Sequence, residues 1–194
     1  MAPVMEQTSV PPWALEPTSR PEQGNELAFD PTATSATVLS YDAGEVASRW
    51  IARLKEQNIP YEYLQLVPRS RMRDQHALAE EHEVLAPCFR EATVGWRLMI
   101  AGPLADVLRA RSLALETGLL DEEILVATTR TDQLPVVCAH CGETTFAEVT
   151  IGDVVDCAGC GESLLIYHHV SRRRAGFLGF KADAEEWSPE SVAI

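Results

Sequence analysis

The stretch from Cys138 to Cys160, CAHCGETTFAEVTIGDVVDCAGC, holds four of the chain's five cysteines in two Cys-x-x-Cys pairs. Fifteen residues separate the pairs, which gives the spacing C-x2-C-x15-C-x2-C of a metal site. A Cys-x-x-Cys turn brings its two sulfurs within about 4 Å of each other, as one edge of a tetrahedral site requires. A glycine follows each pair and lets the backbone turn tightly around the sulfurs. We therefore predict a four-thiolate metal site with the ligands Cys138, Cys141, Cys157 and Cys160.

Zinc is the metal that we expect at these cysteines. Four protein ligands leave no position open for water, so the site is structural, and a segment of about fifty residues needs such a staple because its core is small. The intervening segments TTFAEVT and DVVD have a strand-like composition and predict a hairpin that returns the second pair to the first. Iron in a rubredoxin-like site is the alternative, because a tetrahedral four-sulfur geometry suits both metals.

Other candidate ligands are placed outside the metal site. We expect His140, His168 and His169 to lie beside the ligands or on the surface, because four thiols already complete the coordination. Cys88 stands alone in LAPCFR, and no base is visibly paired with it. We expect it to be a small buried apolar side chain.

The composition divides the chain into four regions. Residues 1–35 hold six of the twelve prolines and are expected to form a tail without a core of its own. Residues 36–130 form the first domain, residues 131–180 the cysteine domain, and residues 181–194 an acidic C-terminal tail.

The first domain alternates strand and helix patterns. Strands are predicted at 36–41, 61–67, 96–102 and 123–129. Asp42 and Glu45 are spaced as a capping box for the first helix, the second helix is predicted over 70–85, and the third begins with Pro103 in its first turn and stops at Gly118. Strands separated by helices indicate a parallel sheet. The predicted fold class is thus α/β, a small parallel-sheet domain followed by a β-rich zinc ribbon.

Charge and hydropathy exclude several classes of partner. The net charge is −13 and the acidic excess is spread along the chain, so we expect no nucleic-acid binding, which needs a basic face. No apolar run reaches the roughly 18 residues of a membrane span. The first 26 residues lack a basic segment followed by an apolar core, so we expect no membrane association and a cytoplasmic location.

Two features are candidates for docking on another protein. Arg172, Arg173 and Arg174 form a basic cluster after the second cysteine pair, suited to an acidic partner. Trp13 lies between prolines in VPPWALEP and could anchor on a partner. The alternatives are that the arginines pair with carboxylates of this chain and that the tail lies on its own domain.

The two cysteine pairs followed by HHVSRRRAGFLGF (168–180) resemble the C-terminal domain of the dimethylamine monooxygenase accessory-subunit (DmmA-like) family. The resemblance implies a subunit of a bacterial oxygenase complex that uses NADPH and oxygen to demethylate dimethylamine to methylamine and formaldehyde. Its implied partners are the catalytic and reductase subunits. We expect a non-catalytic structural or assembly role, and the alternative is a rubredoxin-like iron electron-transfer subunit.

The segment RLMIAGPLADVLRARSLALETGLLDEEILVATTR (97–130) is similar to the end of the nucleotide-binding half of ferredoxin reductases. In that family a strand ends in Cys-Gly-Pro, whereas here the triplet is Ala101-Gly102-Pro103, without the thiol that faces the nicotinamide. The glycine-rich turn for a pyrophosphate is also missing. The resemblance implies a degenerate reductase-like (Rossmann-like) scaffold with no NADPH or flavin on this chain. A dinucleotide near Ala101–Pro103 stays an open alternative.

Overall fold

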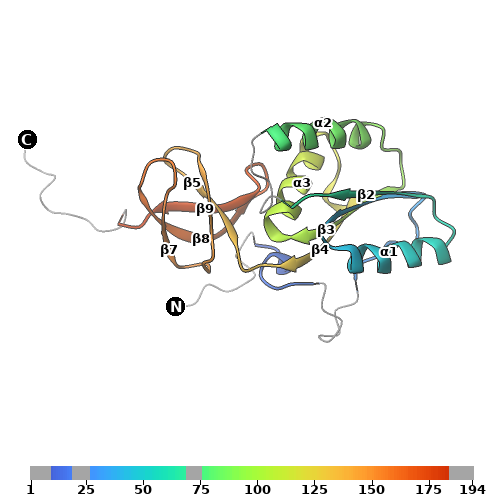
Figure 1. Cartoon of the computed structure of the whole chain (residues 1–194), viewed down its shortest axis with the longest axis horizontal. Helices are drawn as coiled ribbons and strands as arrows, with labels where there is room; N and C mark the ends of the chain where they lie inside the picture. The colour runs from blue at the N-terminus through green and yellow to red at the C-terminus, as the bar shows by residue number, and fades with distance from the viewer. Residues whose placement is uncertain (1–9, 19–26, 69–75, 184–194) are drawn as a thin grey trace, which may run out of the picture. The chain divides into compact units, whose positions relative to one another are not determined.

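The computed structural model of the chain describes residues 10–18, 27–68 and 76–183, which form two compact units (Figure 1). One, here the α/β unit, contains residues 11–131 together with Arg172–Ala175. The other, here the ribbon unit, contains Val10 and residues 132–171 and 176–183. Of the tails predicted at 1–35 and 181–194, residues 1–9, 19–26 and 184–194 lie outside the described residues.

Four parallel strands form the centre of the α/β unit, in the order β2-β1-β3-β4. Their bounds are β1 (Ser35–Tyr41), β2 (Tyr61–Leu66), β3 (Trp96–Pro103) and β4 (Ile124–Arg130). β1 and β3 are buried almost throughout, as expected for the central strands of a sheet covered on both faces. The α/β fold class predicted from the alternation of strands and helices is confirmed.

Helices cover both faces of this sheet (Figure 1). They are α1 (Gly44–Glu56), α2 (His76–Arg90) and α3 (Leu104–Glu116), with short 3-10 helices η2 (Pro12–Ala14) and η5 (Asp121–Glu123). On one face the buried Trp50 and Leu54 of α1 pack against Val38 and Met99. On the other face residues of α2 and α3 pack against Leu39, Leu98 and Ile100. Among the described residues, no helix is long and apolar enough to span a bilayer.

The helix starts differ from those predicted. Ala43 rather than Asp42 is the N-cap of α1 and makes no side-chain hydrogen bond there, and Asp42 has a φ of 51°. The hydroxyl of Ser40 instead accepts a hydrogen bond from the Ala43 N–H at 3.1 Å. Pro103 is the N-cap of α3 rather than its first helical residue. In both cases the residue expected at the helix start still belongs to the preceding turn or strand: Asp42 lies in the bend after β1, and Pro103 is the last residue of β3.

The second helix extends further along the chain than predicted. It runs from His76 to Arg90 and includes Pro87, while the residues predicted at its start, 70–75, lie outside the described part. Leu85 and Phe89 of this helix are buried in the core. Burial of these side chains extends the helix past a proline that, in the sequence, suggests its end.

Five strands form the sheet of the ribbon unit, in the order β6-β5-β9-β8-β7. Their bounds are β5 (Leu134–Cys138), β6 (Thr144–Ala147), β7 (Val154–Asp156), β8 (Ser163–Ser171) and β9 (Gly176–Lys181). The hairpin predicted from TTFAEVT and DVVD is wrong, because β6 pairs with β5 and β7 pairs with β8 at opposite edges of the sheet. β9 lies between the two hairpins, parallel to β5 and antiparallel to β8.

One close approach in the α/β unit depends on a glycine. A Cβ atom at Gly102 would lie 2.7 Å from the Cβ of Tyr41, whose side chain is fully buried. Such a contact is too short for carbon atoms, so a side chain here would force β1 and β3 apart at their carboxyl ends.

We predict that Gly102→Ala lowers the free energy of unfolding of the α/β unit by about 1–3 kcal/mol, because overpacking strains a full core. Gly44→Ala is the matched control, since nothing lies within 4 Å of a Cβ at that helical position. Denaturant titration followed by fluorescence of the buried Trp50 and Trp96 measures both. Equal stability of Gly102→Ala and the wild type would contradict the packing argument.

Candidate metal centre

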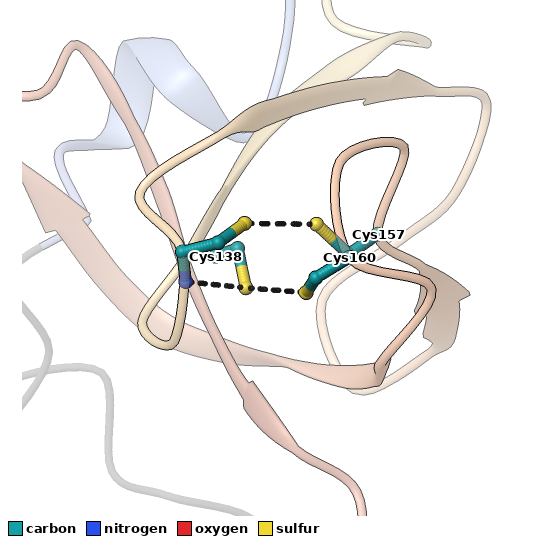
Figure 2. A group of neighbouring side chains, drawn as sticks. Cys138, Cys157 and Cys160 are labelled. Atoms are coloured by element: carbon teal, nitrogen blue, oxygen red, sulfur yellow. Dashed lines mark hydrogen bonds between the residues drawn. The ribbon is translucent and has the colours of Figure 1, made fainter.

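The four predicted cysteine ligands come together in the ribbon unit. Their sulfurs all lie within 4.8 Å of one another, with Cys138 and Cys160 3.8 Å apart and Cys141 and Cys157 3.5 Å apart. A tetrahedral site with metal–sulfur bonds of about 2.3 Å has sulfur–sulfur edges of about 3.8 Å. Figure 2 shows the side chain of Cys138 on one loop facing those of Cys157 and Cys160 on the other. Donor type and spacing therefore fit one divalent metal ion.

Each cysteine pair is the turn of one hairpin, and the two turns repeat the same hydrogen bonds. The N–H of Cys138 donates to Glu143 O and the N–H of Gly142 to Cys138 O. In the second turn, Cys157 donates to Glu162 O and Gly161 to Cys157 O.

Left-handed backbone at both glycines makes the repeat possible. Gly142 and Gly161 have φ values of 79° and 73°, so the role that the sequence assigns to them is fulfilled. The metal site is thus built from two copies of one local structure that face each other.

Amide groups point at the sulfurs and shift their acidity. The N–H of Cys160 makes the largest contribution to lowering the pKa of Cys157, and the Gly159 N–H, 3.4 Å from the Cys157 sulfur, adds to it. Together they outweigh burial, and the pKa of Cys157 falls to about 6. For Cys160 the Glu162 N–H lowers the pKa, but burial and the neighbouring thiols raise it to about 12. The metal-free cluster therefore mixes thiolate and thiol at neutral pH.

A contact that sequence reasoning missed positions the two turns against each other. A Cβ atom at Gly159 would lie 2.9 Å from the Cβ of Glu143 and 3.3 Å from the sulfur of Cys141. The hydroxyl of Thr145 accepts a hydrogen bond from the Ala158 N–H at 2.9 Å and ties the first hairpin to the second turn. The sequence carried one signal of this close approach: Gly159 stands inside CAGC at the position that His140 occupies in the first cysteine pair.

The histidines lie outside the cluster: the cysteines alone make up the metal-binding group found among the described residues, and His140, His168 and His169 are exposed. The lone Cys88 lies on α2 and is half-buried. Burial and, next, the charge of Glu62 raise its pKa, so it is no activated nucleophile. It lines a cavity of about 440 Å³, together with Glu62, Glu91 and Trp96, at the amino ends of β1 and β2.

The candidate docking residues make contacts within the α/β unit. Nη1 of Arg172 lies 3.8 Å from Oδ2 of Asp121, while the Arg172 side chain remains 74% exposed. Arg173 and Arg174 are also exposed. Trp13 is half-buried, and its carbonyl accepts a hydrogen bond from the buried Thr128 hydroxyl at 2.7 Å. Docking by these residues remains a proposal.

At the carboxyl ends of β1 and β3, where a dinucleotide was the open alternative, several residues are buried. Ala101 and Tyr41 are fully buried there, and Gly102 lies against Tyr41. The guanidinium of Arg109 lies 5.8 Å from the centre of the Tyr41 ring.

Residues 135–180, which contain all four cysteines, match the family model described as dimethylamine monooxygenase subunit DmmA-like, C-terminal domain. The ribbon belongs to this DmmA-like family. The resemblance seen in the sequence is thereby confirmed for the ribbon.

A curated relative extends the similarity beyond the ribbon. The heme-dependent oxidative N-demethylase delta subunit of Ectopseudomonas mendocina (strain ymp) is 33% identical over 110 residues. The match takes in 57% of this chain and 62% of the relative, so it spans less than two thirds of the relative's length. No solved structure matches the chain.

We predict that metal affinity falls steeply as the pH falls. The pKa values of Cys141 and Cys160 are raised, so both carry protons in the metal-free chain near pH 7 to 8 and lose them on binding. Displacing at least these two protons makes the apparent Kd for zinc rise about 100-fold or more per pH unit of acidification. Competition with a chromophoric chelator at two pH values, corrected for the chelator's own titration, measures the slope. A slope near zero would contradict binding through these thiols.

Proposed function

We propose that the chain is a non-catalytic assembly subunit of a multi-subunit oxidative N-demethylase, with its ribbon closed by one structural zinc ion. The observation that carries the proposal is the set of four sulfurs within 4.8 Å in a domain of the DmmA-like family. The relative named as the delta subunit of a heme-dependent oxidative N-demethylase supports the assembly role.

The chemistry of the complex is assigned to its other subunits. Four cysteine ligands fill a tetrahedral metal, so this site has no open position for water, oxygen or an amine. We propose that catalytic and reductase subunits carry out an NADPH-dependent demethylation of dimethylamine to methylamine and formaldehyde. The heme in the relative's name then belongs to such a subunit, and this chain holds neither NADPH nor flavin. We place the complex in the cytoplasm.

An iron electron carrier is the second candidate, and the exposure of two ligands favours it. Cys138 and Cys157 are buried, whereas Cys141 and Cys160 are exposed, so two sulfurs of the site reach the surface of the ribbon unit. An electron can enter or leave through such sulfurs. Elemental analysis of the chain expressed with zinc and iron both available separates the two. About one zinc per chain supports the structural role, whereas about one iron with visible absorption supports the carrier.

We predict that Cys157→Ser releases the metal and unfolds the ribbon while the α/β unit stays folded. The ribbon sheet depends on the metal to join its hairpins, whereas the α/β unit has its own two-faced core. Hydrogen exchange followed by mass spectrometry should show lost protection over β5 to β9 and unchanged protection in β1 and β3. Cys88→Ser, outside the cluster, is the matched control. Full protection of the ribbon in Cys157→Ser would mean that metal is not its main staple.

We predict that Arg172→Glu combined with Arg173→Glu weakens association with the other subunits but leaves metal content unchanged. The exposed Arg172–Asp121 pair contributes about 1 kcal/mol or less to folding, so the chain stays folded. Arg90→Glu combined with Arg130→Glu, at two exposed arginines that end α2 and β4, makes the same charge change elsewhere. Co-purification of subunits with a tagged full-length chain measures the effect. Recovery of partners equal to the wild type would remove the docking role.

A further inference from the structure

One face of the ribbon sheet carries apolar side chains that its core does not use. The other face is buried: Leu164, Ile166 and Phe177 are each at most 1% exposed. Side chains alternate between the faces of a strand, so the neighbours of these residues point outward. We call Val154, Leu165, Tyr167 and Phe180 the apolar ribbon face.

The strand register brings these four side chains together. Val154 on β7 lies opposite Leu165 on β8, and Leu165 lies opposite Phe180 on β9, which makes one continuous row across three strands. Tyr167 packs edge-on against Phe180, with ring centres 4.9 Å apart. Val154, Tyr167 and Phe180 are 52%, 39% and 40% exposed. Single exposed apolar residues are normal on protein surfaces, whereas a contiguous exposed apolar patch marks an interaction site.

The charge around this face is acidic. Asp156 lies in the next row of the face, opposite Ser163, whose hydroxyl donates to it at 2.8 Å. Lys181 lies opposite Leu164 and so belongs to the buried face of the sheet, and it pairs with Glu162 and Asp183 at 3.7 and 3.4 Å. Among the described residues of the ribbon unit, seven carboxylates stand against this one lysine, so the border of the apolar ribbon face is negative.

The acidic border favours one kind of binding partner for this face over the others. In a two-fold dimer of this chain the same border would meet itself, and facing like charges oppose association. Residues 184–194 of the chain contain three glutamates and no lysine or arginine, so they meet the same repulsion. A surface with an apolar centre and a basic border is complementary.

We infer that the apolar ribbon face docks another subunit of the complex through an apolar patch bordered by lysines and arginines. The inference rests on the proposed assembly role and names the surface that performs it. Aromatic side chains such as Tyr167 and Phe180 supply large contact area at an interface centre, while the charged border sets its specificity.

The test uses the full-length chain carrying an affinity tag. Stoichiometric subunits that co-purify with it are identified by mass spectrometry, purified, and titrated with the wild type and with Tyr167→Ser/Phe180→Ser at low and high salt. We expect the double variant to bind at least about tenfold more weakly, as for central interface residues. Val94→Ser is the control, because Val94 is 96% exposed in the other unit, and it should bind as the wild type does. Asp156→Lys should weaken binding and reduce its salt dependence.

Metal content is measured on every variant, and Val154→Ser replaces the double variant if the latter loses metal. Wild-type affinity in the metal-loaded face variant would overturn the inference while leaving the assembly role intact. If no subunit co-purifies with the wild type, the proposed function fails and the inference fails with it. A face-dependent dimer in light scattering would make a second copy the occupant and overturn the inference. Deletion of residues 184–194 gives one more check. If the deletion increases the binding of an apolar dye, and Tyr167→Ser/Phe180→Ser abolishes that increase, the chain's own end is the occupant and the inference is overturned.

Discussion

The convergence of four cysteine sulfurs is the constraint on which the ribbon unit depends. Its two hairpins, β5–β6 and β7–β8, lie at opposite sides of β9, and each contributes one Cys-x-x-Cys turn. A metal ion bound by all four sulfurs cross-links these hairpins, so its binding free energy becomes folding free energy. Gly159 allows the close approach, because any side chain there would strike Glu143 and the sulfur of Cys141.

The α/β unit meets the same need for stability in another way. Its sheet is covered by helices on both faces and buries large side chains such as Trp50 and Phe89. At the carboxyl ends of β1 and β3, Gly102 lies in close contact with the buried Tyr41. A unit with a full core of its own is suited to act as a scaffold, which agrees with the proposed assembly role.

The ribbon unit divides its sheet between two tasks. One face, with Leu164, Ile166 and Phe177, forms the core. The opposite face exposes Tyr167 and Phe180 beside acidic side chains. A metal-stapled sheet can leave apolar residues exposed because the metal supplies stability that a second buried face would otherwise provide. On the proposed function, stability and partner recognition are carried by different atoms of one small domain.

The sequence by itself determined the ligand set, the glycines that follow it and the parallel sheet, because each follows from local spacing or periodicity along the chain. Only the tertiary structure decided that β6 and β7 lie on opposite edges, that the Ser40 hydroxyl binds the Ala43 N–H before α1, and that Val154, Leu165 and Phe180 share a row. These features depend on which strands pair and in which register. Strand composition reports a tendency to be in a sheet, but pairing is set by packing and by contacts between turns that are distant in the sequence.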